Sequence, residues 1–211
     1  MKSQFSEKFN HDPIAVGYDE NVTNENNPIR KGYSDVMRWV TDMTDGSNVL
    51  VDLGCGTGNT AQRVKDYERM YCVDISWNML DIAKKKLEGK NIEFKESDLL
   101  GFFDDLGRNE DIDTVMSTYA IHHLTQEEKH ILFEKIYGCL PQWGCIVFAD
   151  LMFKNRAYEE SMKKKYPDLV EDFEDELYWN VDDEVKKLES IGFRVRVSQF
   201  SDLSWGVYGE R

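Results

Sequence analysis

The sequence predicts an α/β fold in which helices cover both faces of a mostly parallel sheet. Strand-like segments recur along the chain, at residues 49–53, 69–75, 91–97, 113–120 and 145–151, and most of them are apolar. Segments with helical periodicity separate most of them, and such alternation is typical of a parallel sheet. Two further strand-like segments, 193–200 and 204–208, are joined by only three residues. This terminal hairpin predicts that the last strand runs antiparallel to the rest.

The first predicted strand and the turn after it carry the most information. Residues 49–53 are apolar except for Asp52, and three glycines follow within five residues. Glycine adopts positive φ without strain and lets a ligand approach bare backbone N–H groups. A helical pattern from 59 to about 66 predicts that the turn lies at the start of a helix, as in nucleotide-binding folds. The turn could also be no more than a tight strand–helix connection.

Composition limits the class of protein. The chain has 211 residues, of which 41% are apolar, and this suits one globular domain. Its net charge of −14 argues against nucleic acid or an anionic membrane as the main partner. No segment reaches the ~18 apolar residues of a membrane span, and the first ten residues lack the apolar core of a signal peptide. Four cysteines without metal-type spacing fit reduced thiols, so we expect a cytoplasmic protein.

Residues 1–47 precede the first strand. They are too few for a core of their own, so we expect them to form a cap within the same domain as residues 48–211. The spacing of Tyr33, Val36 and Val40 predicts a helix over 29–43. Such a segment would cover an edge of the sheet, the pocket at the strand ends, or both.

Acidic residues stand at the ends of three successive strands, at Asp52, Asp74 and Asp98. Carboxyl ends of neighbouring parallel strands meet at one crevice, so these carboxylates should lie near one another. Asp74 stands about twenty residues beyond the glycine turn, where a carboxylate can accept hydrogen bonds from both ribose hydroxyls of an adenosine. Ile75 and Met79 could lie against the adenine. Asp98 could equally be an ordinary helix cap.

Two motifs resemble those of the class I S-adenosylmethionine (SAM) methyltransferases. Asp52-x-Gly54-x-Gly56-x-Gly58 is similar to their motif I, and residues 117–129, STYAIHHLTQEEK, resemble the fourth motif of small bacterial members. The resemblance extends in order from residue 49 to 208. It implies a Rossmann-like sheet of seven strands in the order 3-2-1-4-5-7-6, with the last strand antiparallel. It also implies that the relatives are small bacterial methyltransferases of unassigned acceptor.

The charge of the ligand supports the same reading. SAM has no phosphate and carries a sulfonium and an ammonium group, which a carboxylate such as Asp52 would attract. The same carboxylate would repel the pyrophosphate of a dinucleotide, an anion that favours a helix N-terminus. Residues Gly56, Gly58 and Ala61 nevertheless meet the dinucleotide fingerprint, so an NAD-linked oxidoreductase stays an alternative, although no Tyr-x-x-x-Lys dyad is present. A SAM-binding module without turnover is another alternative.

The resemblance implies a set of cofactor contacts. Tyr18 would reach the cofactor from the N-terminal segment, Asp98 would accept the adenine amine, and the N–H of Leu99 would serve a ring nitrogen. Ser117, near the end of the fourth strand, would face the methionine part of SAM. The complete expected set is Tyr18, Asp52, Gly54, Cys55, Gly56, Asp74, Ile75, Met79, Asp98, Leu99 and Ser117.

The candidate catalytic residues are Tyr119, near the end of the fourth strand, and His122 and His123, which follow it. A hydroxyl or protonated-amine acceptor needs a base, and imidazole titrates near neutral pH, whereas a thiolate or neutral amine needs none. Neighbours on a regular strand point to opposite sides, so one of the two histidines should pack or cap instead. No further ligand stands nearby in the sequence, so no metal site is expected. We therefore expect SAM-dependent methyl transfer by in-line displacement to a small-molecule acceptor, carried out by a monomer or homodimer.

Overall fold

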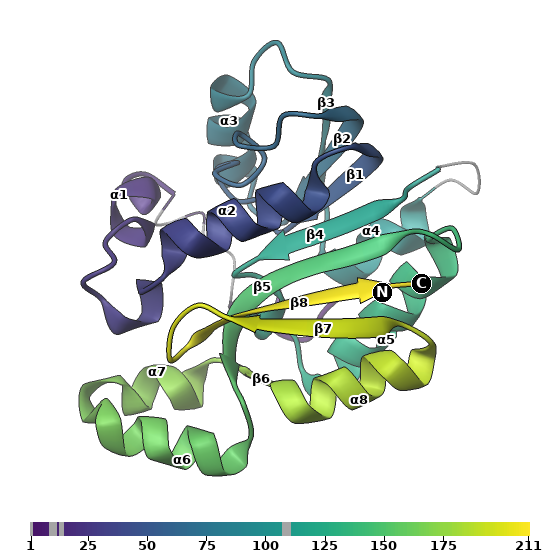
Figure 1. Cartoon of the computed structure of the whole chain (residues 1–211). Coiled ribbons are helices and arrows are strands. Elements are labelled where there is room, and N and C mark those ends of the chain that lie inside the picture. Colours follow the sequence, from purple (N-terminus) through teal and green to yellow (C-terminus); the bar gives the residue numbers. More distant parts are fainter. Residues whose placement is uncertain (1, 9–11, 13–14, 107–110) are drawn as a thin grey trace.

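The computed structural model describes residues 2–8, 12, 15–106 and 111–211. A mixed sheet runs through the middle of the molecule, with helices packed on both of its faces (Figure 1). The strand order is β3-β2-β1-β4-β5-β8-β7, and a short additional strand, β6, pairs with β5 alone. Without β6, this is the predicted order of seven strands, which is therefore confirmed.

The first five strands pair in parallel, and β8 runs antiparallel to both β5 and β7, as the terminal hairpin predicts. The strands are β1 (Ser47–Leu53), β2 (Tyr67–Asp74), β3 (Ile92–Glu96), β4 (Thr114–Thr118), β5 (Cys145–Phe153), β6 (Trp179–Asn180), β7 (Arg194–Gln199) and β8 (Ser204–Glu210). The sequence did not predict β6, because two residues are too few to show a strand pattern.

Helices fill the connections between strands and the N-terminal region. The α-helices are α1 (Tyr18–Val22), α2 (Tyr33–Thr44), α3 (Trp77–Lys86), α4 (Leu99–Asp105), α5 (Gln126–Cys139), α6 (Arg156–Lys165), α7 (Val170–Asp175) and α8 (Val181–Ile191). Short 3-10 turns are η2 (Pro28–Arg30), η3 (Ile121–His123) and η4 (Pro167–Leu169). In the described part of the chain, none of these helices is long and apolar enough to cross a lipid bilayer.

The two faces of the sheet carry separate apolar cores. On β1, Val51 and Leu53 face one core, to which α4, α5 and α8 contribute. Leu50 faces the other core, which contains residues of α2, α3, α6 and α7. Both faces of this central strand are covered, so its side chains are buried on either side, as expected for parallel sheets.

Residues 54–66 correct one prediction. They form a series of turns between β1 and β2, not the helix expected over 59–66. A single helical-type bond, from Gln62 N–H to Gly58 O at 2.9 Å, begins the segment. The Nζ of Lys90 donates to the carbonyls of Ala61, Gln62 and Val64, which a helix would have turned toward its own backbone. Helix nucleation is unfavourable in so short a segment, and the hydrogen bonds from Lys90 stabilise the turns instead.

The N-terminal residues cross the carboxyl ends of the strands. Ser3 Oγ donates to Asp98 at 2.7 Å, and the backbone N–H of Gln4 donates to Glu128 at 2.6 Å. Further along, the helix expected over 29–43 begins later, at Tyr33, because Gly32 adopts a left-handed φ of 84° between η2 and α2. The bonds of Ser3 and Gln4 hold the first residues beside the start of α4 and the start of α5.

Candidate functional site

A cavity opens at the carboxyl ends of β1 to β4, the place where open α/β sheets bind their ligands. Two of the three candidate catalytic residues, Tyr119 and His123, line it. So do nine of the expected cofactor contacts: Tyr18, Gly54, Cys55, Gly56, Asp74, Ile75, Met79, Asp98 and Leu99. Its other wall comes from the N-terminal region, through Ser3, Phe5, Val22, Arg30, Tyr33 and Met37. The cavity is therefore formed jointly by the strand ends and the N-terminal segment.

The glycine turn after β1 has little room on one side and open space on the other. A Cβ built on Gly54 would lie 2.3 Å from the Cβ of Ala120, so only glycine fits there. Gly56 has φ 52°, and a Cβ built on it would meet no atom within 4 Å. The cavity wall at Gly56 is thus bare backbone, which a ligand can approach closely.

Asp74 ends β2 and holds this turn in place. Its Oδ2 accepts the N–H of Gly56 and its Oδ1 accepts the N–H of Ser76, both at 2.8 Å. Burial raises the pKa of Asp74 above its ordinary value, against the lowering effect of the backbone donors. Each carboxylate oxygen has a second lone pair, so Asp74 can still accept hydrogen bonds from a ligand in the cavity.

Asp52 lies beneath the turn instead of in the cavity wall. As an interior residue of β1, it is flanked by Cys72 of β2 and Met116 of β4, and its exposed fraction is 0%. Neither carboxylate oxygen has a hydrogen-bond partner among the described residues. Burial, followed by the charge of Asp74, raises the pKa of Asp52 to about 8. Asp52 is therefore not among the residues that line the cavity, and its expected contact with the cofactor stays a prediction.

Asp98 is a helix cap that also lines the cavity, and its expected bond to the adenine amine stays a prediction. It caps α4, with Oδ1 accepting the N–H of Leu100 at 2.9 Å, and it lines the cavity. Its Oδ2 accepts the hydroxyl of Ser3. The backbone N–H of Leu99 belongs to the first turn of α4, where N–H groups have no partner within the helix.

Ser117 is the other expected contact that does not line the cavity. Its side chain is buried within the sheet, where the hydroxyl donates to the carbonyl of Leu53 at 2.7 Å. Thr118, the next residue of β4, reaches the cavity wall instead. Because neighbours on a strand point to opposite faces, an error of one residue moves the expected contact to the wrong side.

Tyr119 lines the cavity in a strained conformation, with φ 54°. Its ring stacks on Tyr33 at a centroid distance of 5.9 Å, and its hydroxyl bonds to Ser204 Oγ at 3.1 Å. Burial raises the pKa of Tyr119 above its ordinary value. Because its hydroxyl bonds to Ser204 and its pKa is raised, Tyr119 is poorly suited to act as a general base.

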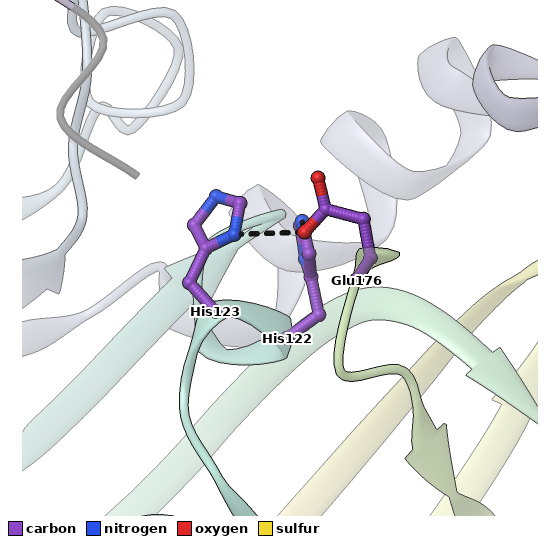
Figure 2. Close-up of side chains that lie close together, drawn as sticks. All are labelled: His122, His123 and Glu176. Atoms are coloured by element: carbon purple, nitrogen blue, oxygen red, sulfur yellow. Dashed lines mark hydrogen bonds and ion pairs between the residues drawn. The ribbon is translucent and has the colours of Figure 1, made fainter. Parts of the chain in front are cut away.

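The two histidines of η3 lie in different surroundings. His123 lines the cavity, and its Nδ1 lies 3.1 Å from Glu176 Oε2 (Figure 2). His122 is buried behind it, where its Nδ1 bonds to Asp150 Oδ1 and its backbone N–H donates to Asp150 Oδ2 at 2.9 Å.

Three charged residues of the site were not predicted. Arg30 lines the cavity with its guanidinium 5.5 Å from the centre of the Tyr119 ring, and no carboxylate among the described residues pairs with it. Asp150 and Glu176 bond to the histidine pair. Only Asp150 left a signal in the sequence, as an acidic residue inside an apolar strand. Arg30 and Glu176 stand in polar segments that match no motif.

Comparison with known proteins places the chain in a family. Residues 50–144 match the family model described as a methyltransferase domain. An uncharacterized methyltransferase of Anoxybacillus flavithermus is 34% identical over 201 residues, covering 92% of this chain and 90% of the relative. Another, from Bacillus cereus strain ATCC 10987, is 32% identical and covers 97% of each.

Solved structures share the fold. A DhpI–SAH complex matches with a TM-score of 0.71 at 13% identity, covering 99% of this chain and 98% of that one. The magnesium protoporphyrin IX methyltransferase of Synechocystis PCC 6803, with bound SAM, matches with a TM-score of 0.67 at 17% identity, covering 95% and 93%.

Fold and sequence together define this protein as a class I SAM-dependent methyltransferase. Within that class, the chain belongs to the family of the uncharacterized bacterial methyltransferases that it matches over nearly its whole length.

Proposed function

We propose that the cavity binds SAM and that the protein transfers its methyl group to a small-molecule acceptor by in-line displacement. The observation that carries this proposal is the buried carboxylate of Asp52, which lacks a partner among the described residues and lies beneath the bare backbone of the glycine turn. A buried carboxyl group normally has a hydrogen-bonding or ionic partner, so we expect a cationic ligand near Asp52 that favours its ionised form. The complexes of DhpI with SAH and of the Synechocystis enzyme with SAM, both of the same fold, support the identity of that ligand.

The adenosine would lie at the ends of β2 and β3. Asp74 would accept the ribose hydroxyls with the lone pairs that Gly56 and Ser76 leave free. Asp98 would accept the adenine amine, for which the Ser3 hydroxyl must share or release Oδ2. The apolar side chains of Ile75 and Met79 line the same part of the cavity.

The methionine part would lie between the glycine turn and the end of β4. Arg30 stands on that side of the cavity, beside Tyr119, and is the described cation best placed to pair with the cofactor carboxylate. Asp52 would attract the ammonium group from below. The aromatic faces of Tyr33 and Tyr119 favour a nearby positive charge.

SAM supplies an electrophilic methyl group on a positively charged sulfur. The protein itself would orient the acceptor and exclude water, because holding reacting atoms ~3–3.5 Å apart and in line can supply several kcal/mol of rate acceleration. Tyr119 and His123 form the wall where the acceptor would stand. The net charge of −14 supports a small molecule over a nucleic acid as acceptor.

Calorimetry tests the cofactor. The untagged protein is titrated in separate experiments with SAM, S-adenosylhomocysteine and NADH. Saturable binding of the two adenosyl ligands without NADH binding is the expected result. NADH binding in their place would overturn the proposal in favour of an oxidoreductase.

Methyl-labelled SAM and a fractionated cell extract test the reaction. Label is expected in the small-molecule fraction and to depend on the protein. Label found only in protein or nucleic acid would overturn the acceptor class, and cofactor binding without any label transfer would favour a module without turnover.

A further inference from the structure

Three side chains beside the cavity converge on one point (Figure 2). We propose that His122, His123 and Glu176 form a binding site for a divalent transition-metal ion. One ligand atom from each residue lies within 4.8 Å of the other two. This site goes beyond SAM binding and does not depend on it.

The separations of the ligand atoms suit one ion. Glu176 Oε2 lies 3.1 Å from His123 Nδ1 and 3.8 Å from His122 Nε2. Metal–nitrogen and metal–oxygen bonds of about 2.0–2.2 Å in a tetrahedral site place two ligands roughly 3.3–3.5 Å apart. The two observed separations lie on either side of that value, so small rotations of the side chains would bring all three onto an ion.

Asp150 already holds His122 in a fixed orientation. Asp150, with an exposed fraction of 1%, bonds to Nδ1 of His122 and also accepts the N–H of His122 and the Nε1–H of Trp179, at 2.9 and 3.2 Å. A carboxylate that accepts from one ring nitrogen of a histidine fixes the tautomer and turns the lone pair of the other nitrogen toward a metal.

The same tautomer leaves an electrostatic conflict for an ion to resolve. With Nδ1 donating to Asp150, the Nε2 of His122 presents a lone pair to the carboxylate of Glu176. The 3.8 Å between them is too long for a direct hydrogen bond. A positive charge between the two acceptors would remove the repulsion, and it could be a metal ion or an additional proton on His122. The 3.8 Å between Nε2 and Oε2 favours the metal ion, because a proton shared by the two atoms would bring them closer together.

The backbone brings the third ligand into place. Glu176 directly follows α7, and the N–H of the next residue, Leu177, donates to the carbonyl of His122 at 3.1 Å. The nearby Lys8 amine pairs with Asp175 at 2.7 Å, and its charge acts on Glu176 from a greater distance. The earlier expectation of no metal site rested on spacing along the chain, which could not reveal a ligand 53 residues from His123.

Two imidazoles and one carboxylate suit Zn²⁺, Co²⁺, Ni²⁺ or Fe²⁺, and three protein ligands leave a coordination position open. Because His123 lines the cavity, that position would lie near the place of the acceptor. An ion there could bind and polarise an oxygen of the acceptor.

The test uses full-length protein without a histidine tag, stripped with a chelator. Titration with ZnCl₂ is followed by calorimetry, and titration with CoCl₂ by the visible absorption of bound Co²⁺. One equivalent per chain and a cobalt spectrum of low coordination number are expected. Neither measurement depends on methyl transfer, so failure of the proposed enzyme function would leave the result intact.

Matched variants locate the ion. Glu176→Gln and Asp150→Asn are each expected to weaken Zn²⁺ binding at least tenfold. Glu174→Gln, on α7 and exposed, and His130→Gln, on α5, should bind as the wild type does. Circular dichroism confirms that each variant is folded. For any variant that does not fold, the cobalt spectrum of the wild type decides alone.

Wild-type protein that binds no Zn²⁺ or Co²⁺ would overturn the proposal, as would an unchanged affinity in Glu176→Gln. A doubly protonated His122 at neutral pH, seen by NMR in metal-free protein and unaffected by added Zn²⁺, would show that a proton occupies the gap instead.

Discussion

The backbone N–H of Gly56 donates a 2.8 Å hydrogen bond to Asp74, which joins the end of β2 to the glycine turn after β1. The same carboxylate accepts the N–H of Ser76 ahead of α3. Asp74 therefore shapes the turn in addition to its proposed role with the ribose. A substitution there should affect both the stability of the protein and its affinity for the cofactor.

Replacement of Asp74 by alanine is expected to weaken SAM binding by ~1–3 kcal/mol, because the charged hydrogen bonds to the ribose are lost. It should also lower the free energy of unfolding, since two backbone N–H groups lose their acceptor. Calorimetry and denaturant unfolding measure the two effects. Asp81→Ala, at the exposed face of α3, is the control. Unchanged SAM affinity in a folded Asp74→Ala protein would refute the ribose assignment.

Asp52 should make the stability of the ligand-free protein depend on pH. Its pKa in the folded state is about 8, well above the ordinary value of 3.8, so the folded protein retains a proton that the unfolded chain releases. Its contribution to stability is fully present below pH 3.8 and is lost as the pH rises to about 8. Relative to Asp52→Asn, the wild type should therefore lose stability across this range, by an amount on the order of a few kcal/mol. Denaturant unfolding from pH 5 to 9 measures it, and a difference that does not vary with pH would contradict the prediction.

Cofactor binding should release protons through the same residue. An ammonium group held above Asp52 favours the ionised carboxylate and lowers its pKa, whereas the neighbouring Asp74 raises it. At pH 7, binding of S-adenosylhomocysteine should therefore release part of a proton. Calorimetry in buffers with different ionisation enthalpies gives the number released. The Asp52→Asn variant should release less, and equal release from both proteins would assign the proton to another group.

Arg30 should distinguish ligands by their carboxylate. Arg30→Gln is expected to weaken S-adenosylhomocysteine binding about tenfold, or 1.4 kcal/mol, through the loss of one ion pair. Binding of 5′-methylthioadenosine, which has no carboxylate, should be unchanged. Arg38→Gln, whose arginine pairs with Asp35 on the exposed side of α2, is the matched control. Equal weakening of both ligands would show that Arg30 supports the cavity without pairing with the carboxylate.

The strands themselves were predictable from local patterns, and their order followed from the family resemblance. Apolar runs mark buried strands, and the resemblance to known motifs sets their order. The helix expected at 59–66 failed because Lys90, from the far end of the next strand–helix unit, binds the carbonyls of that segment. A contact of this kind leaves no trace in the local sequence.

The site was predictable to the extent that its residues follow strand ends. Asp74 and Asp98 line the cavity as expected. Asp52 and Ser117 do not line the cavity. Each lies one residue before the end of its strand, where its side chain is buried within the fold. Arg30 and Glu176 reach the site through tertiary packing of polar segments, which periodicity cannot reveal.

The positions of Ser3 and Arg211 matter for how the protein is prepared. Ser3 lines the cavity beside Asp98. The backbone N–H of Arg211 instead donates to the carbonyl of Gly144, in the turn just before the amino end of β5. An affinity tag fused ahead of Ser3 would start close to the cavity and could compete with ligands there. Purification handles and fluorescent labels therefore belong after Arg211, at the opposite ends of the strands from the cavity.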